Sequence, residues 1–413
     1  MLQSFKQTLK RNQTISYYNS LLKGPLQCRL ASGGLARYRR QARHLGLRQP
    51  SEPELRQALA DRLETRRITP RGKSKGDLHI FFPYALENWE RVLAPALECF
   101  GRVTQFEWTS LGFNHHVSNW LKVRDEMNRS MLTAFQRAYS QESIDVVFGY
   151  LSGYTTDPEI LAQMARAGAV IFNFSLDDKL HFPGKVAGGR YRNTAALAHV
   201  VDLNLTNAPE SIIKYMVHGG LAAFWPEAAD PDVHKPYDCN FEFDVSFVGK
   251  CYGWRPRFIQ RLTKLGVKVE CFGGGWPNGP LSDEEMVRLY SRSRINLGFA
   301  GVAHSRRLMC LKGRDFEVPA SGGLYLTQNN TELDLVYDVG REIVTYADEH
   351  DCAAKIRELL ADPHKAEAIR IAGYHRALVE HTWHGRFARI FTLAGLLRQQ
   401  TPIDTPRVVT STF

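Results

Sequence analysis

Short apolar runs alternate with amphipathic segments in the first half of the chain, from residue 77 onward. The apolar runs predict five strands, at residues 77–84, 103–108, 144–150, 169–178 and 200–207. The segments between them predict helices, at residues 88–101, 119–140, 158–168 and 209–220. Strands that alternate with helices are typical of a parallel sheet, so this half predicts an α/β domain.

The same alternation restarts after an irregular stretch. Residues 225–244 contain three prolines and little periodicity, which is typical of an interdomain linker. Beyond it, four apolar runs predict strands, at residues 245–250, 267–274, 295–300 and 342–347. Ser282 stands three residues before Glu285 and predicts a capping box at a helix start. The pattern therefore predicts two similar parallel-sheet domains, joined by a linker, that face each other across a cleft.

Length and composition agree with two domains. A chain of 413 residues is too long for one core of usual size, and 44% hydrophobic residues can fill two cores. No run of 18 or more uncharged apolar residues occurs, and the first residues lack the apolar centre of a signal peptide. We therefore expect a soluble, cytoplasmic protein. Its seven cysteines are scattered without a C-x-x-C pair, so we expect them to be reduced.

Positive charge is concentrated at the N-terminal end. Residues 1–75 hold 17 Lys or Arg against 4 Asp or Glu, so they carry a net charge of +13, while the rest carries −3. This segment predicts a basic, helical extension, most basic at residues 36–48. Two interpretations stay open: a solvated extension that packs on the body, or an arm that binds lipid head groups, nucleic acid or a polyanionic glycan.

The loops that follow strands are candidate sites, because open parallel sheets bind ligands at the carboxyl ends of their strands. Residues 247–257 follow the first strand of the second half. There Gly249 permits a tight turn, while Lys250 and Arg255 bring positive charge to a helix start. Such a loop suits a phosphate or diphosphate. Glycines and basic residues after strands are also common without any ligand, so this motif is weak alone.

Residues 311–327 change character in the middle, from a charged segment through two glycines to a strand. If residues 312–320 form a short helix, charged side chains lie near the cleft and glycines end the helix. These residues are Lys312, Arg314 and Glu317, then Gly322 and Gly323. A carboxylate there could accept hydrogen bonds from the vicinal hydroxyls of a ribose, and the cations could neutralise a diphosphate. The alternative is a solvated carboxylate followed by a C-cap.

In the first half, two adjacent carboxylates follow a predicted strand. Asp177 or Asp178 could act as a base on an acceptor hydroxyl or orient it, while capping a turn is the alternative. In the second half, His381 is a possible general base by residue type. It lies near the junction of two late helices, so we expect it to pack there with Trp383 and Arg386.

Several segments occur in an order that resembles a known family. They are FVGKCYGWRPRFIQRL, INLGF, LKGRDFEVPASGGLYLTQ, EIVTYAD, RELLADP and AGYHRALVEHTWHGRF. This series resembles the nucleotide-binding half of the spore-maturation-type glycosyltransferases, which are similar to group 1 glycosyltransferases of the GT-B fold. The resemblance covers residues 76–395. It implies an α/β fold in which two Rossmann-like domains face each other across a cleft.

The resemblance also implies a division of the chain and a set of site residues. The parts are residues 1–75, a basic helical extension; 76–230, an acceptor domain; 231–385, a nucleotide-sugar-binding domain; and 386–413, a helix that crosses back and a tail. The donor-binding candidates are Glu317 for the ribose hydroxyls, with Gly249, Lys250, Lys312, Gly322 and Gly323. The catalytic candidates are Lys250, Arg255 and Arg314 on the diphosphate, and Asp178 on the acceptor side.

One position departs from the family pattern. Relatives often carry a second glutamate eight positions before Glu317, where this chain has Met309. The nearby loop with His304, Arg306 and Arg307 could take over the contact to the donor sugar.

The resemblance implies a hexosyltransferase-like enzyme that moves a sugar from a nucleotide-sugar donor to an acceptor hydroxyl on a glycan or other cell-surface glycoconjugate. Retention of configuration and independence of metals or other cofactors are expected with it. Two alternatives remain: a nucleotide-sugar epimerase of the same fold, or a non-catalytic protein that binds polyanions through residues 1–75. We expect no specific nucleic-acid partner, and the extension is the expected contact if the protein attaches to the inner face of an anionic membrane.

Overall fold

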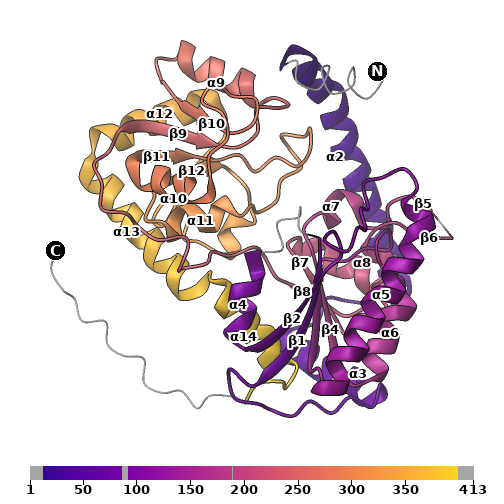
Figure 1. The fold of residues 1–413 in the computed structure, drawn as a ribbon. Coiled ribbons are helices and arrows are strands. Elements are labelled where there is room, and N and C mark those ends of the chain that lie inside the picture. The colour runs from indigo at the N-terminus through magenta and orange to yellow at the C-terminus, as the bar shows by residue number, and fades with distance from the viewer. Residues whose placement is uncertain (1–12, 86–91, 188, 399–413) are drawn as a thin grey trace.

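Two parallel β-sheets flanked by helices form the body of the protein (Figure 1). The computed structural model describes residues 13–85, 92–187 and 189–398 of the chain. The predicted fold class, α/β with two Rossmann-like domains, is confirmed. The irregular stretch that follows Phe224 joins the two sheets, as the proline-rich segment predicts.

The N-terminal sheet has six parallel strands in the order β2-β1-β3-β4-β7-β8. Their bounds are β1 (Leu78–Tyr84), β2 (Gly101–Glu107), β3 (Val146–Gly149), β4 (Val170–Ser175), β7 (Leu203–Thr206) and β8 (Ala222–Phe224). The helices of this domain are α4 (Ala94–Glu98), α5 (Trp120–Gln141), α6 (Pro158–Arg166), α7 (Asp178–His181) and α8 (Ile212–Val217). Every residue of β1, β3, β4 and β7 is buried, because helices cover both faces of such a sheet.

The pattern of the sequence misses three short elements of this domain. Strand β8 follows the strand at residues 200–207, which we expected to be the last of this half. The hairpin of β5 (Val186–Ala187) and β6 (Arg190–Tyr191) is also unpredicted. Strands of two or three residues are too short to show a period of two. The first part of the helix expected at residues 88–101 lies outside the described residues.

The C-terminal sheet has five parallel strands in the order β10-β9-β11-β12-β13. Their bounds are β9 (Phe243–Val248), β10 (Glu270–Phe272), β11 (Ser293–Leu297), β12 (Tyr325–Gln328) and β13 (Val344–Tyr346). The helices are α9 (Arg255–Lys264), α10 (Asp283–Arg292), α11 (Arg314–Ala320), α12 (Glu349–Ala361), α13 (Pro363–Glu380) and α14 (Trp383–Leu393). The predicted capping box at the start of α10 is confirmed: Ser282 Oγ accepts from the Glu285 amide at 3.2 Å.

The last helix returns to the N-terminal domain, where α14 lies beside α4 (Figure 1). Phe387 and Phe391 pack against Phe100 there. His381 lies at the crossing point and is only 3% exposed, with Nε2 2.6 Å from the Val336 carbonyl oxygen. Burial, and next the charge of Arg386, lower the pKa of His381 to about 4. The interpretation of His381 as a packing residue is confirmed.

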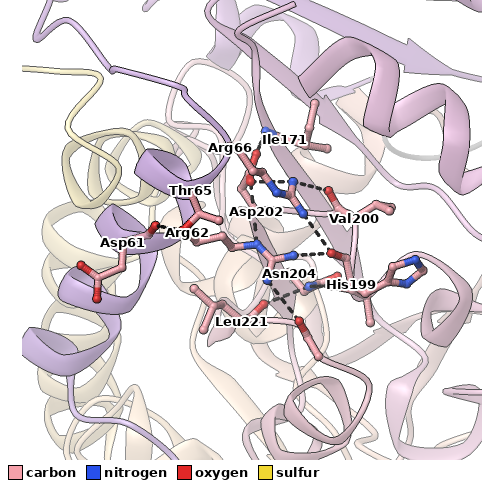
Figure 2. Close-up of polar contacts among 12 residues, drawn as sticks. Asp61, Arg62, Thr65, Arg66, Ile171, His199, Val200, Asp202, Asn204 and Leu221 are labelled. Atoms are coloured by element: carbon pink, nitrogen blue, oxygen red, sulfur yellow. Dashed lines mark hydrogen bonds and ion pairs between the residues drawn. The ribbon is translucent and has the colours of Figure 1, made fainter. Parts of the chain in front are cut away.

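The N-terminal extension is helical, and its second half belongs to the core of the N-terminal domain. Helix α3 (Glu52–Thr65) buries Leu55, Leu59 and Leu63 in the same hydrophobic cluster as the sheet. Figure 2 shows arginines of α3 bound around one buried carboxylate, that of Asp202. Arg66 donates to it at 2.7 Å, and the Ile171 amide donates at 2.8 Å. Part of the basic charge therefore holds this helix in place.

Helix α2 (Gln13–His44) touches both domains. Near its end, the Tyr38 hydroxyl lies 3.1 Å from His218 Nε2 in the N-terminal domain. Near its start, Ser20 Oγ lies 3.4 Å from Nδ1 of His304 in the C-terminal domain. A Cβ on Gly24 would lie 2.7 Å from the His304 carbonyl oxygen, so only glycine permits this close approach. The structure thus supports an extension that packs on the body; its residues 1–12 lie outside the described residues.

Two further expectations concern cysteines and membranes. All seven cysteines are free thiols, as their scattered positions predict. Among the described residues, none of the helices combines the length and the apolar character needed to cross a bilayer.

Candidate active site

The loop after β9 lies at the carboxyl edge of the C-terminal sheet, where the strand order changes direction between β9 and its two neighbours. Such a position is the usual ligand site of an open parallel sheet. Gly249 makes close packing possible, because a Cβ there would lie 2.8 Å from the Phe247 ring and 3.5 Å from Nη2 of Arg314. Lys250 follows with an exposed side chain. Gly249 and Lys250 therefore lie at the carboxyl edge of the sheet, as the sequence predicts, and their contact with a ligand stays a prediction.

Arg255 begins α9 and is mostly buried. Its guanidinium carbon lies 4.7 Å from the Tyr252 ring centre and 5.7 Å from that of Phe299. It also donates to the Lys250 carbonyl at 3.3 Å. These contacts fix the shape of the loop that carries Lys250. Arg255 is thus a residue that positions the loop, with its charge close to that of Arg314.

Helix α11 brings its charged residues to the same edge, because its other residues anchor it in the core. Phe316 and Ala320 are completely buried against the sheet, as their one-turn spacing predicts. Asp315 ties the first turn of the helix to the preceding loop, since its carboxylate accepts from the Lys312 amide at 2.7 Å. Glu317 and Arg314 remain only partly buried. The predicted helix therefore forms and presents both charges at its surface.

Several charged side chains at this edge lack partners. Among the residues that the structure describes, Lys250, Arg314, Glu317 and Glu227 form no side-chain hydrogen bond or ion pair with one another or with other residues. Partly buried charges without partners are costly unless water or a ligand satisfies them. We call these four residues, together with Lys312, the charged cluster. Its mixture of cations and carboxylates suits a ligand that carries both phosphates and hydroxyls.

Glu227 is the member of the charged cluster that the sequence did not indicate. It comes from the linker between the domains, and its Oε1 would lie 3.3 Å from a Cβ on Gly313, while Oε1 of Glu317 would lie 2.7 Å from that Cβ. Burial, and next the Glu317 carboxylate, raise the pKa of Glu227 from 4.5 to about 8. Glu227 therefore carries a proton near neutral pH and can donate a hydrogen bond. A glutamate in an irregular linker gives no pattern that could have revealed this.

The two glycines assigned to donor binding have a different role. Gly322 adopts φ +69° directly after α11 and lies against Pro236 and Arg370, at the opposite end of the helix from Arg314. A Cβ on Gly323 would lie 2.7 Å from Asn296 Nδ2, inside the sheet. The structure therefore corrects this assignment: both glycines end the helix and permit packing, which was the alternative interpretation.

The N-terminal domain has a cavity of about 400 Å³ at the carboxyl ends of its strands. Aromatic residues and hydroxyl or amide groups share its wall. The lining includes Trp108, Tyr150, Tyr154, Phe174, Ser152, Thr155 and Asn193. Aromatic faces beside a few polar groups are typical of small-molecule sites, and this volume lies within their usual range. Asp177 and Asp178 lie at one side of it.

Asp178 is already bound by the protein. Its carboxylate is 1% exposed and accepts hydrogen bonds from Ser175 at 2.9 Å, Thr194 at 2.9 Å and Tyr215 at 2.7 Å. Burial raises the pKa of Asp178, although these hydroxyls act against that shift. The geometry contradicts the role of Asp178 as a base and supports the turn-capping alternative. The neighbouring Asp177 is exposed and faces the cavity.

Lys179 connects this cavity wall to the C-terminal domain. Its Nζ bonds to the carboxylate of Glu332 and to the carbonyl of Met309, and it lies 3.2 Å from Oε1 of Glu210 in its own domain. Its side chain is only 9% exposed. Met309 comes three residues before Lys312, so this bridge joins the wall of the cavity to the segment that leads into the charged cluster. The sequence did not indicate this bridge.

The loop with His304 and Arg306 does not lie in the charged cluster. His304 binds α2, and its amide donates to Gln27 Oε1 at 3.0 Å. Arg306 lies over the Trp254 ring at 4.7 Å and donates to Glu349 at 3.2 Å. Both side chains therefore have partners outside the charged cluster.

Comparison with known proteins agrees with this geometry. Residues 255–392 match the family model described as Glycosyl transferase-like, which covers α9 through most of α14. None of the curated proteins matches the chain.

Solved structures share the fold at low sequence identity. A sucrose-phosphate synthase from Thermosynechococcus elongatus superposes with a TM-score of 0.53 at 12% identity, over 77% of this chain and 98% of that one. A glycosyltransferase from Rickettsia africae gives 0.53 at 10% identity, over 77% and 98%. HepE from Anabaena, in complex with UDP and glucose, gives 0.51 at 10% identity, over 76% and 100%. The chain therefore has the GT-B fold, and its C-terminal domain is similar to the glycosyl transferase-like family.

Proposed function

We propose that this protein is a glycosyltransferase that moves a sugar from a nucleotide-sugar donor to an acceptor hydroxyl. The observation that carries the proposal is the charged cluster at the carboxyl edge of the C-terminal sheet, in which Arg314, Glu317 and Glu227 have no hydrogen-bond or ion-pair partner among the described residues. The resemblance of the sequence and the match to the family model over residues 255–392 support it. HepE, a protein of similar fold, is described as binding UDP-glucose.

Each residue of the charged cluster has a role in this proposal. Glu317 accepts hydrogen bonds from the ribose hydroxyls of the nucleotide. Lys250 and Arg314 bind the diphosphate, and they stabilise the charge that develops on it when its bond to the anomeric carbon breaks. The protonated Glu227 donates a hydrogen bond to a phosphate oxygen or a sugar hydroxyl. Arg255 acts through the loop that it anchors.

The acceptor binds in the aromatic cavity of the N-terminal domain. Its sugar ring packs on an aromatic face such as that of Tyr154, and Asp177 accepts a hydrogen bond from the reacting hydroxyl. The new bond joins this oxygen to the anomeric carbon, and the hydroxyl proton leaves with the displaced diphosphate or to Asp177. We propose a glycan or other glycoconjugate as the acceptor class, because aromatic and hydroxyl groups together suit a sugar ring.

Retention of configuration and independence of metals complete the proposal. Retention rests on the resemblance of the sequence. Metal independence rests on the roles proposed for Lys250 and Arg314, whose positive charges would neutralise the diphosphate without a metal ion. The ion pair between Lys179 and Glu332 would hold the two domains together over the donor. The closed arrangement would exclude water and so limit hydrolysis of the donor.

Product analysis tests this function. The protein is incubated with each common nucleotide sugar, with and without simple methyl glycosides as acceptors, and products are identified by mass spectrometry. We expect nucleoside diphosphate release that acceptors accelerate, and a loss of about a hundredfold in rate for Arg314→Gln. Glu284→Gln, an exposed change on α10, serves as the control. Formation of an epimeric nucleotide sugar without acceptor, or no reaction with any donor, would contradict the proposal.

A further inference from the structure

Helix α2 has one face whose side chains are exposed to solvent. Exposed residues recur every three or four positions along it, so they share one side of the helix. They are Tyr18, Leu22, Leu26, Leu30, Gly33, Arg37 and Arg40. The four apolar members are 55% to 77% exposed. Large side chains rarely gather on a surface in this way unless they meet a partner.

The opposite face of α2 is fixed on the protein. Its buried residues follow the same spacing, at Ser20, Gly24, Ala31, Tyr38 and Ala42. Contacts with His304 in one domain and His218 in the other hold the helix at both ends. Rotation of α2 to hide its leucines would therefore break both contacts. The outer face stays available to a partner while the protein is folded.

The charges on this face identify the kind of partner. Its first half carries the apolar side chains together with the exposed Arg29, and its second half is basic, with Arg37 and Arg40 on the stripe and Arg39 and Arg43 beside it, all exposed. A helix that combines exposed leucines with arginines is typical of one that lies in the interface of an anionic bilayer. Nucleic acid would use the arginines alone. A second copy would find a face only one helix wide, whereas stable interfaces bury about 800 Å² per partner.

We propose that α2 docks this protein on the surface of an anionic lipid bilayer. Leu22, Leu26 and Leu30 enter the boundary between head groups and acyl chains, while Arg37 and Arg40 contact lipid phosphates. The inference does not depend on the catalytic function, because the surface lies outside the cleft. The basic charge of residues 1–75 already suggests a contact with anionic lipid. Because α3 packs in the core of the N-terminal domain, α2 is the helix of this segment that we assign to that contact.

Cosedimentation with vesicles tests the docking surface, using the full chain without any donor. Binding should occur with vesicles of phosphatidylcholine that contain phosphatidylglycerol, weaken in high salt, and be much weaker with phosphatidylcholine alone. Arg37→Gln with Arg40→Gln should lower the partition coefficient about thirtyfold, at about 1 kcal/mol per basic residue. Replacement of Leu22, Leu26 and Leu30 by Ser should lower it at least tenfold. Circular dichroism checks that each variant is folded.

Matched controls lie on other exposed surfaces. Val379→Ser on α13 removes an 80% exposed apolar side chain, and Arg341→Gln removes an exposed charge; neither should change binding. Equal binding to both kinds of vesicle, or an equal loss in the controls, would overturn the proposal. So would a dimer in sedimentation velocity that the leucine variant converts to a monomer without any vesicle binding, because the face would then join two copies.

Discussion

Glu317 and Glu227 share a small region of the cleft, where glycine at position 313 lets both carboxyl groups approach. A pair of carboxyl groups at this distance cannot comfortably carry two negative charges. One proton resolves the conflict, and Glu227 holds it because burial acts most strongly there. The Glu317 carboxylate lies near Arg314. The two groups can thus offer one acceptor and one donor to the hydroxyls of a ligand.

The first prediction concerns recognition of the ribose. Glu317→Gln should weaken nucleoside diphosphate binding by about 1.5 to 3 kcal/mol, the range for hydrogen bonds to charged groups, and leave the fold intact. A dideoxynucleotide lacks the vicinal hydroxyls, so its affinity should change much less. Calorimetric titration of both ligands on both proteins measures this. Equal losses for the two ligands would show that Glu317 does not contact the ribose.

The second prediction follows from the proton on Glu227. Between pH 4.5 and 8 the folded protein keeps a proton that the unfolded chain has lost, so its free energy of unfolding falls as pH rises through this window. Glu227→Gln removes this dependence. The free energy of unfolding of Glu227→Gln, relative to that of wild type, should therefore rise by about 2 kcal/mol from the low to the high end of this pH window. This value is smaller than the full pKa shift implies, because the Glu227 side chain is partly exposed.

Urea unfolding at several pH values measures the effect of Glu227→Gln. The same series on Glu284→Gln, which changes an exposed glutamate on α10, supplies the baseline. Parallel pH profiles for wild type and Glu227→Gln would mean that Glu227 is ionised at neutral pH, and its role as a donor would be lost.

For single residues, the sequence predicts the surroundings of a side chain well only when its neighbours are close to it in the chain. Lys312, Arg314 and Glu317 lie within one short helix, so their shared position follows from its period. Asp178 looks like a cleft carboxylate from its place after a strand, but hydroxyls of Thr194 and Tyr215, far away in sequence, occupy it. Long-range partners of this kind leave no trace in local pattern.

Among the elements, α3 shows how a basic segment can be structural. Its arginines bind the buried Asp202 and backbone carbonyls of the N-terminal domain, including that of Val200 at 2.6 Å from Arg66 (Figure 2). Its leucines complete the core. Deletion of residues 1–75 would therefore remove part of the core and could not isolate a role of the surface. Charge counts left both a packed extension and a binding arm open, because they do not tell paired cations from solvated ones.

The third prediction tests this anchoring of α3. Asp202→Asn removes the charge that pairs with Arg66 and Arg62, so it should lower the free energy of unfolding by about 3 kcal/mol. Asp61→Asn changes an exposed residue of the same helix and should stay within about 0.5 kcal/mol of wild type. Both are measured by urea unfolding. A loss under 0.5 kcal/mol for Asp202→Asn would show that the ion pair does not hold α3.

For the molecule as a whole, the sequence predicts the two domains well and their contacts poorly. The alternation of strands and helices is local and repeats on both sides of the linker, so the two sheets follow from it. The contacts between the domains combine distant segments: Lys179 with Glu332, and α2 with both halves. The return of α14 was expected only through the family resemblance.

The fourth prediction concerns metals. Because cationic side chains are proposed to bind the diphosphate, sugar transfer should continue at nearly the same rate in excess chelator. Initial rates with and without chelator, and with added divalent ions, measure this. Loss of activity in chelator that a divalent ion restores would assign the diphosphate to a metal, and the exposed Asp177 would become the first candidate ligand.

The central claim is that the charged cluster binds the diphosphate of a nucleotide-sugar donor, and one calorimetric experiment tests it most directly. A panel of nucleoside diphosphates is titrated into wild type, Arg314→Gln and the control Glu284→Gln. At least one should bind wild type and the control equally, and bind Arg314→Gln about ten- to a hundredfold more weakly, because a hydrogen bond between two charged groups is lost. Binding of no diphosphate by the wild type, or equal affinity for Arg314→Gln, would contradict the account.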